Sequence, residues 1–386
     1  MKNIQLFIPK FRNEEIFEHM SECLNHGWTG LGFKTIEFEK KWIEYTNLNN
    51  AHFVNSNTSG LHLALKILKD VNKWSDNDEI ITTPLTFVSS NHAIVYEKLK
   101  PVFADVDEFL CLDPISVENS ITKKTKAILF VGVGGNAGRL DLISNICKKY
   151  NLKLILDAAH MSGTWVQQKS EFGTNLGHAG FDCDVSVFSF QAVKNLPTAD
   201  SGMICFKNQD YDSLCRKLSW LGIDKDTYQR TTDKGIYKWE YDLVDVGYKY
   251  HGNSIMACMG LVGLRYLESD NLRRRELCRL YDNFLGNDIQ IIRMSDITKV
   301  PSRHLYQIIV PNRNKVMEYL NTQGIFPGVH YRDNTNYKQY NYGFGSCPKS
   351  HKYSEQLISL PLHLKLSDED VEYVSDKLLS AKKILF

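Results

Sequence analysis

The feature that most constrains the fold is a regular alternation of apolar runs and amphipathic segments between residues 51 and 206. The apolar runs are short and rich in Val, Ile, Leu and Phe, which is typical of strands buried on both faces. This rhythm predicts an α/β fold whose mostly parallel seven-stranded sheet carries helices on both faces. The predicted strands are residues 51–54, 79–82, 101–105, 127–131, 153–156, 185–188 and 203–206, and the predicted helices between them are 61–69, 89–96 and 140–149.

The segments on either side of this alternation differ from it. Residues 14–24 and 35–45 predict amphipathic helices before the first strand. Residues 210–250 mix tyrosine with charge and have no clear period, which predicts a partly irregular excursion toward a neighbouring subunit. The apolar stripe of the second helix consists of Ile36, Phe38, Trp42 and Tyr45.

The last third of the chain predicts a smaller unit. Residues 254–267 and 272–285 read as two long helices that leave the large domain, and a capping pair, Ser367 with Asp370, starts a later helix. We therefore expect a large domain over residues 1–255 and an α+β domain over residues 256–386. Within the second, strands are predicted at 290–294, 305–310 and 328–331, and helices at 314–323, 354–357 and 367–378.

Composition excludes several classes of protein. The net charge is +1, which argues against a nucleic-acid partner, and no apolar run reaches the roughly 20 residues of a membrane span. The apolar part of the N-terminus is too short for a secretory signal. Nine cysteines with no C-x-x-C pair favour reduced thiols in the cytoplasm over a disulfide framework or a metal site.

Three motifs carry chemistry. Lys194 follows the strand at 185–188, and burial there would lower its pKa toward the value that an imine-forming amine needs. Asp157 ends the run at 153–156, at the strand edge where open α/β sheets bind ligands. Residues 53–60 lead from a strand into a helix start that suits a phosphate. A lone lysine of this kind is usually a solvated loop residue, but an anion site, an acid and a lysine together are what pyridoxal phosphate requires.

A glycine-rich loop offers an alternative interpretation. Residues 132–138 (Gly-Val-Gly-Gly-Asn-Ala-Gly) follow a strand and suggest a dinucleotide-binding loop. The strict G-x-G-x-x-G pattern would need glycine at Ala137, and the loop lies far from the first strand. A turn between strand and helix is therefore the favoured interpretation.

The chain resembles the DegT/DnrJ/EryC1/StrS family of sugar aminotransferases, which have the fold-type I (aspartate aminotransferase-like) architecture. The resemblance runs nearly from end to end. It is carried by residues 27–30 (Gly-Trp-Thr-Gly), 54–65, 84–88 (Pro-Leu-Thr-Phe-Val), 157–160 (Asp-Ala-Ala-His), 189–195 (Ser-Phe-Gln-Ala-Val-Lys-Asn), 330–331 (His-Tyr) and 360–362 (Leu-Pro-Leu).

The resemblance implies a role for each matching residue. Lys194 would form the Schiff base with pyridoxal phosphate and then move protons, and Asp157 would keep the pyridine nitrogen protonated. His160 would sit near the ring's phenolic oxygen. The alternatives are a helix cap or salt bridge for Asp157 and a satisfied core histidine for His160. Thr58, Ser59 and Ser189 would bind the phosphate, and Phe87 would stack on the ring unless it is a plain core residue.

The sequence departs from the family pattern at three points. Gln191 stands where histidine is common, with little expected chemical consequence. Lys194 is kept where sugar-dehydrating members have histidine, which disfavours dehydration. Lys249 and His251 replace the usual asparagine and arginine of a loop that reaches the phosphate of the adjacent subunit's cofactor. Lys249 would make that contact with a full charge, and His251 is a candidate substrate contact.

The acceptor substrate is less constrained. His330, Tyr331 and Arg332 would line the mouth of the site, where Arg332 would meet a substrate phosphate or form a surface ion pair. A second group of residues would clamp a nucleotide or form a dimer interface. It consists of Trp220, Tyr228, Arg230 and Trp239.

The resemblance implies a homodimeric aminotransferase with shared sites. It would pass an amino group, with L-glutamate as the expected donor, to a keto carbon of a nucleotide-linked deoxysugar by a ping-pong mechanism. One alternative is a small phosphorylated ketone, such as a triose phosphate, as acceptor. A non-catalytic sensor or regulator that binds the cofactor is the other, although the chain has no basic arm or helix-turn-helix extension.

Overall fold

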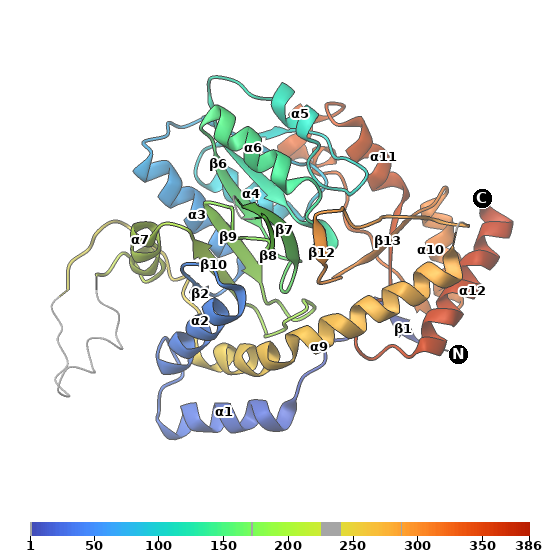
Figure 1. The fold of residues 1–386 in the computed structure, drawn as a ribbon, viewed down its shortest axis with the longest axis horizontal. Helices are drawn as coiled ribbons and strands as arrows, with labels where there is room; N and C mark the ends of the chain where they lie inside the picture. Colours follow the sequence, from blue (N-terminus) through green and yellow to red (C-terminus); the bar gives the residue numbers. More distant parts are fainter. Residues whose placement is uncertain (1, 171–172, 225–240, 287) are drawn as a thin grey trace.

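A seven-stranded mixed sheet forms the centre of the molecule (Figure 1). The structure, a computed structural model, describes residues 2–170, 173–224, 241–286 and 288–386. The strand order is β2-β10-β9-β6-β5-β3-β4, and only β10 runs antiparallel to its neighbours, so the predicted α/β fold with a mostly parallel sheet is confirmed. The strands are β2 (His52–Val54), β3 (Glu79–Thr82), β4 (Lys100–Phe103), β5 (Thr125–Val131), β6 (Lys153–Asp157), β9 (Val185–Ser189) and β10 (Gly202–Phe206).

Helices cover both faces of this sheet because its strands are apolar on both sides. In β5, Ile128 and Phe130 belong to one buried cluster, and Ala127 and Leu129 belong to the other. The first cluster includes side chains of α2 (Phe33–Thr46), α6 (Leu140–Tyr150) and α9 (Ser254–Leu285). The second includes those of α3 (Asn57–Val71), α4 (Val88–Tyr96) and α7 (Gln209–Ser219).

Helix α2 shows how the predicted stripe meets the core. Trp42 is fully buried, and its ring centroid lies 5.0 Å from that of Phe188 and 5.1 Å from that of Phe190. Phe38 is buried beside it. Ile36, which the sequence placed on the same stripe, is instead 54% exposed, because it lies near the start of α2, off the buried face.

The C-terminal region has its own small sheet and core. Strands β11 (Gln290–Ile291), β13 (Tyr306–Ile309) and β15 (Leu357–Leu360) form an antiparallel sheet. Its buried cluster includes residues of α10 (Arg313–Thr322) and α12 (Asp368–Leu385), and Ser367 and Asp370 form the predicted capping box of α12. The division at residues 255 and 256, close to the start of α9, remains a prediction.

The N-terminal segment packs on the C-terminal region through a short strand pair. Strand β1 near the N-terminus pairs with β14, so the first residues join the C-terminal region. Within the described ranges, no helix combines the length and apolarity of a membrane span. The remaining elements are β1 (Ile4–Gln5), α1 (Asn13–Asn25), α5 (Pro114–Asn119), η1 (Val133–Gly135), β7 (Trp165–Ser170), β8 (Gly173–His178), β12 (Thr298–Val300), β14 (Ile325–Phe326), η2 (Asn334–Asn336), η3 (Lys338–Gly343) and α11 (Pro348–Gln356).

Several predicted elements were wrong in extent. The two helices expected at 254–267 and 272–285 are one continuous helix, α9, because the polar residues between them have tertiary partners. Asp270 pairs with Arg12, with oxygen–nitrogen distances of 2.7 and 2.6 Å.

Other predicted elements differ in extent or type. The strand expected at 328–331 is reduced to one bridge, between Gly328 and Ser359. Residues 354–356 end α11 and Leu357 begins β15. The excursion at 210–250 begins with α7, and the hairpin β7–β8 was not predicted.

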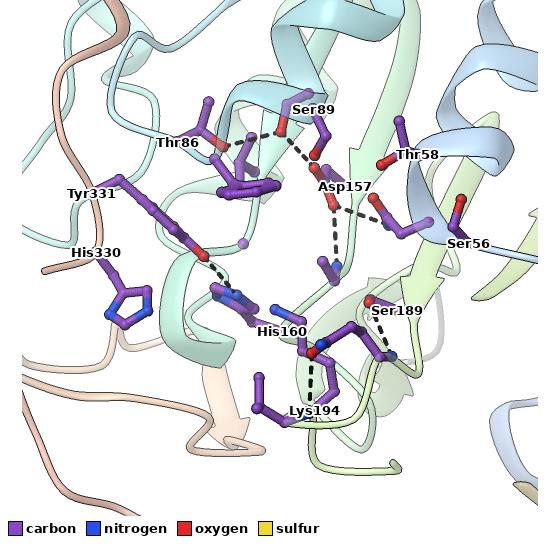
Figure 2. Close-up of a pocket in the computed structure, with 18 of the residues that line it drawn as sticks. Ser56, Thr58, Thr86, Ser89, Asp157, His160, Ser189, Lys194, His330 and Tyr331 are labelled. Carbon is purple, nitrogen blue, oxygen red and sulfur yellow. Dashed lines mark hydrogen bonds between the residues drawn. The ribbon is translucent and has the colours of Figure 1, made fainter. Parts of the chain in front are cut away.

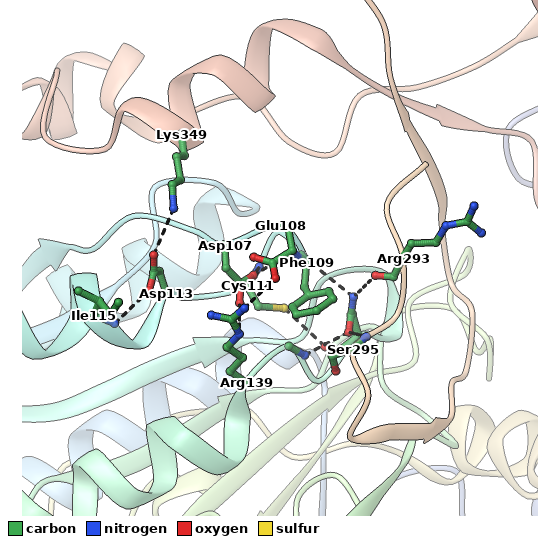
Figure 3. A network of polar contacts seen from close by, with 12 residues as sticks. Asp107, Glu108, Phe109, Cys111, Asp113, Ile115, Arg139, Arg293, Ser295 and Lys349 are labelled. Carbon is green, nitrogen blue, oxygen red and sulfur yellow. Dashed lines mark hydrogen bonds and ion pairs between the residues drawn. The ribbon is translucent and has the colours of Figure 1, made fainter. Parts of the chain in front are cut away.

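Polar contacts fasten the C-terminal region to the large domain (Figure 3). The Lys349 ammonium lies 3.3 Å from the Asp113 carboxylate. Asn136, in the loop after β5, donates to the carbonyl of Arg293 at 2.9 Å and accepts from the backbone N–H of Ser295 at 3.1 Å. Strand β12 also pairs with β7, so the segment around residues 293–300 is anchored on the large domain.

The buried carboxylate of Glu39 helps to hold α2 against the sheet, and its contribution to stability can be tested. Burial raises the pKa of this carboxyl, but the Arg216 guanidinium, His52 and the Phe53 backbone N–H outweigh burial and hold the pKa at about 2. Because this is below the ordinary value of 4.5, Glu39 adds stability above pH 4.5 that is lost as the pH falls toward 2. We expect Glu39→Gln to lower the free energy of unfolding by about 2–3 kcal/mol at pH 7.

Thermal unfolding between pH 7 and pH 3 checks this prediction. The variant should lose less stability than the wild type on acidification. Glu44→Gln is the matched control, because Glu44 pairs with Lys41 on the exposed face of the same helix and such pairs contribute little. Equal melting temperatures for the two variants would contradict the predicted role of Glu39.

Candidate active site

A cavity of about 630 Å³ opens where the parallel strands β5, β6 and β9 end. Parallel strands bring their carboxyl ends to one edge of a sheet, so the loops after them meet there. Residues 329–332 of the C-terminal region contribute to the wall (Figure 2). Of the residues predicted from the sequence, the lining contains Thr58, Phe87, Asp157, His160, Ser189, Lys194, His330, Tyr331 and Arg332.

Asp157 is the last residue of β6 and is buried in the cavity wall. Its Oδ2 accepts from the Ser90 hydroxyl at 2.7 Å, and its Oδ1 accepts from the Asn57 amide and the Ala159 backbone N–H, both at 3.2 Å. Burial raises the pKa of this carboxyl, whereas the donors and the Lys194 charge oppose the rise. The result is an oriented, buried carboxyl group that suits a protonated ring nitrogen.

Lys194 lies in the loop after β9 and lines the same cavity. Its backbone N–H donates to the carbonyl of Gln191 at 2.8 Å, which forms a tight turn. Burial lowers the pKa of the Lys194 amine to about 8, although the Asp157 charge acts in the opposite direction. A part of this amine is therefore uncharged near neutral pH and can attack an aldehyde.

His160 joins the cavity wall to Tyr331. The backbone N–H of Gly134 donates to His160 Nδ1 at 3.1 Å, and His160 Nε2 lies 3.0 Å from the Tyr331 hydroxyl. Burial holds the pKa of His160 well below 6.5, so the ring is neutral. Because Nδ1 is an acceptor, the proton is on Nε2 and is donated to Tyr331. The Tyr331 hydroxyl can then donate its own proton to a second acceptor.

His330 precedes Tyr331 on the same wall and has a different set of partners. Its Nδ1 lies 2.9 Å from the Ser359 hydroxyl, and its carbonyl accepts from the Gln307 side chain at 2.8 Å. Burial, followed by the charge of Lys194, lowers the pKa of His330 to about 4. His330 therefore adds no positive charge to the site near neutral pH.

The start of α3 provides the candidate anion site. Ser56 is its N-cap and accepts from the Ser59 backbone N–H at 3.1 Å, and Thr58 and Ser189 line the cavity nearby. The N–H groups and dipole of a helix start favour an anion. Ser59 is not among the lining residues, and its hydroxyl donates to Asn55 at 2.6 Å, so its phosphate contact remains a prediction.

The mouth of the cavity is aromatic and basic. Phe87, the N-cap of α4, is 59% exposed, and its ring centroid lies 6.1 Å from that of Tyr331. The Arg332 guanidinium carbon lies 5.1 Å from the ring centroid of Tyr337, which also lines the cavity. Flat apolar and cationic groups here can stack on a planar ligand or meet a phosphate.

Besides Ser59, two predicted residues lie outside this cavity. The Lys249 ammonium stands 3.2 Å from the ring centroid of Trp220, and burial lowers the pKa of Lys249. The His251 ring also contacts Trp220, with centroids 4.5 Å apart. The predicted roles of Lys249 and His251 are therefore not tested within one subunit. The other residues of the suggested clamp, Tyr228, Arg230 and Trp239, lie outside the described residues.

The residues that donate hydrogen bonds to Asp157 were not predicted from the sequence. Asn57 is adjacent to the predicted Thr58, and Ser90 follows Phe87 by three residues, which is one helical turn. Helical spacing from the start of α4 could have indicated that Ser90 points toward the same site. Tyr337 could not be found in this way, because it directly follows η2 (Asn334–Asn336), a short element that was not predicted.

Known proteins resemble this chain in sequence and in fold over nearly its whole length. The sequence profile of the DegT/DnrJ/EryC1/StrS aminotransferase family matches residues 11–379. The chain belongs to this family. Its members' aminotransferase chemistry and pyridoxal phosphate cofactor therefore apply to this enzyme. The sequence-based recognition of the family is confirmed.

Individual relatives support the assignment. The enzyme is 32% identical over 383 residues to SpsC, a spore coat polysaccharide biosynthesis protein of Bacillus subtilis, covering 95% of this chain and 94% of SpsC. Its structure is similar to that of PseC from Helicobacter pylori, an aminotransferase involved in the biosynthesis of pseudoaminic acid. The TM-score is 0.87 and the identity 25%, with 99% of this chain and 100% of PseC covered.

A third relative has been solved with both forms of the cofactor. Spr1654, a proposed sugar aminotransferase of Streptococcus pneumoniae, has structures in a pyridoxal form and in a pyridoxamine form. The pyridoxamine-form structure has a TM-score of 0.88 and 29% identity to this chain, and all of each chain is covered.

The cavity suits this aminotransferase cofactor. It combines a buried carboxyl group with three donors at one strand end, an amine with a lowered pKa at another, and a helix start between hydroxyl side chains. Asp157, Lys194 and the start of α3 would hold the ring nitrogen, the aldehyde and the phosphate, respectively.

The titration of Lys194 tests this site without the cofactor. In the apoenzyme, the rate at which a small neutral acylating reagent labels Lys194 should rise with pH, with its midpoint at about 8, because only the uncharged amine reacts. Site-resolved mass spectrometry measures this, with the exposed Lys383 as an internal reference. In Asp157→Asn the midpoint should move lower, because the carboxylate favours the ammonium. A midpoint near 10.5 would contradict burial of this amine.

Proposed function

We propose that this enzyme transfers an amino group from L-glutamate to a keto carbon of a nucleotide-linked deoxysugar. The observation that carries the proposal is the form of the cavity: Asp157 is buried and Lys194 half-buried in its wall, while the exposed Phe87 and Arg332 and the half-buried Tyr337 line its mouth. A mouth of this kind suits a large, flat and anionic acceptor. The roles of SpsC in spore coat polysaccharide biosynthesis and of PseC in pseudoaminic acid biosynthesis support a sugar acceptor.

Different residues of the chain have different roles in the proposed reaction. Bound pyridoxal phosphate supplies a protonated ring that accepts electrons from the carbon losing its proton. Asp157 keeps the ring nitrogen protonated through its negative charge. Lys194 holds the cofactor at rest and, once released, carries a proton between carbon atoms as a general base and acid. The neutral His160 orients Tyr331, whose hydroxyl can donate to an oxygen in the site.

The absorbance of the bound cofactor tests these proposed roles. L-glutamate should convert the visible band of the lysine-bound cofactor to the band of its amino form, and a nucleotide-linked ketosugar should restore the first band. Lys194→Ala should lose the visible band and lower turnover by more than about 10³-fold, because both the link and the proton carrier are removed. A bound cofactor that glutamate leaves unchanged would favour the sensor or regulator instead.

Arg332 supports one alternative acceptor. An arginine at the mouth can bind a phosphate with two parallel hydrogen bonds, so a small phosphorylated ketone remains a second candidate. Restoration of the visible band by a triose phosphate, and by no nucleotide sugar, would decide in its favour. Lys249 and His251, which the sequence also offered for this alternative, do not line the cavity of their own subunit.

We propose a homodimer in which Lys249 reaches the cofactor phosphate of the partner. Exposed apolar side chains near this loop support an interface, and Val246 is 82% exposed. The others in this patch are Leu221, Leu243 and Val244. A cytoplasmic location is part of the proposal, and the nine unbridged cysteines support it.

Complementation between two inactive chains tests the shared site. A mixed dimer of Lys194→Ala and Lys249→Ala chains contains one site with both lysines if Lys249 acts across the interface. We expect such dimers, made by co-expression with two affinity tags, to recover up to about half of the wild-type turnover. Each variant alone should stay impaired. No recovery in the purified mixed dimer would place Lys249 in the site of its own chain.

A further inference from the structure

The segment 302–304 of the C-terminal region contacts three loops of the large domain behind the cavity. The Ser302 hydroxyl donates to the carbonyl of His160 at 2.6 Å. The His304 backbone N–H donates to the carbonyl of Gly134 at 3.1 Å, and His304 Nδ1 lies 3.0 Å from Asn195 Oδ1. This segment therefore touches the loops that follow β5, β6 and β9, all of which contribute to the cavity.

Asn195 directly follows Lys194 and is buried with every polar atom of its side chain paired. Its amide nitrogen donates to Asn271 Oδ1 at 2.8 Å and to the carbonyl of Ser302 at 2.7 Å. Its amide oxygen can only accept, so His304 Nδ1 carries the proton between them. His304 thus completes the set of bonds that fixes the residue next to the reactive lysine.

The His304 ring is held in this orientation by two other rings. It stacks on Phe7 with centroids 5.3 Å apart and planes 9° apart, and its centroid lies 4.3 Å from that of His160. The side chain is 1% exposed, and burial keeps its pKa well below 6.5. A neutral ring fixed by stacking is a permanent single donor, so it orients Asn195 without adding a charge beside Lys194.

We propose that His304 is a positioning residue for the transamination reaction, which orients Lys194 through its hydrogen bond to Asn195. The inference rests on the proposed role of Lys194. A tight placement of the amine matters because small displacements of a reacting group cost large factors in rate. His304 touches neither the substrate nor the reacting atoms in this arrangement, since it does not line the cavity.

Two substitutions distinguish the effect of the Nδ1 hydrogen-bond donor of His304 from the effect of its aromatic ring. His304→Asn places an amide N–H near the position of Nδ1 but removes most of the ring, whereas His304→Phe keeps an aromatic ring and removes the donor. The matched control is His178→Phe, because His178 is also buried among aromatic rings and its ring nitrogens have no hydrogen-bond partner among the described residues. Lys194→Ala is measured beside them.

Each variant is examined in three ways. The first is the acylation rate of Lys194 in the apoenzyme at one pH. The second is the fraction of bound pyridoxal phosphate in the visible band, and the third is the turnover with L-glutamate in single-turnover experiments. Melting temperatures are recorded to separate a general loss of stability from a local effect.

We expect His304→Phe to lower the apoenzyme acylation rate and the single-turnover rate about tenfold, on the scale of one lost hydrogen bond. His304→Asn should stay within about threefold of the wild type because it restores the donor. His178→Phe should leave both rates unchanged whatever its melting temperature.

Three results would overturn the inference: wild-type rates in His304→Phe, equal losses in both His304 variants, or equal losses in His178→Phe. A failure of the proposed function is recognised separately, because Lys194→Ala would then retain the visible band and its response to L-glutamate.

Discussion

The buried Asp157 and the half-buried Lys194 line one cavity, where the charge of each changes the pKa of the other. Water screens this interaction poorly in a buried site, so the surrounding groups decide which protonation states are populated. Ser90, Asn57 and Ala159 donate to the carboxylate, and the loops of the sheet edge remove the amine from bulk water. Asn57 and Ser90 come from α3 and α4, so the packing of these two helices on the sheet places two of the three donors to Asp157.

The parallel strands make the arrangement possible. Strands β5, β6 and β9 end at one edge, and helices on both faces bury nearly all of their residues, so the loop residues after them have fixed starting points. A site built in this way has rigid support on the strand side. On the other side, residues 329–332 and the segment 302–304 come from the C-terminal region, so the geometry of the cavity depends on contacts between residues far apart in the sequence.

Much of this was predictable from short-range patterns. The β-rich runs identified the central strands, and the family motifs identified Asp157 and Lys194, because each of those signals lies within a few neighbouring residues. Partners from distant segments were not predictable. The hydrogen bond between His304 and Asn195 joins residues 109 positions apart, and the single helix α9 persists through a polar stretch only because Asp270 and Asn271 find tertiary partners. The strand expected at 328–331 forms only one bridge, to Ser359, and this outcome also depends on a partner that is distant in the sequence.

The unbroken course of α9 has a consequence for changes in chain length. The helix runs for 32 residues, contacts α1 and α2 near its start, and packs against α12 further along. One inserted or deleted residue in its middle would rotate everything downstream by about 100° and shift it by about 1.5 Å. Recombination between relatives that cuts within α9 must therefore preserve its residue count, whereas loops at the surface tolerate insertions far more readily.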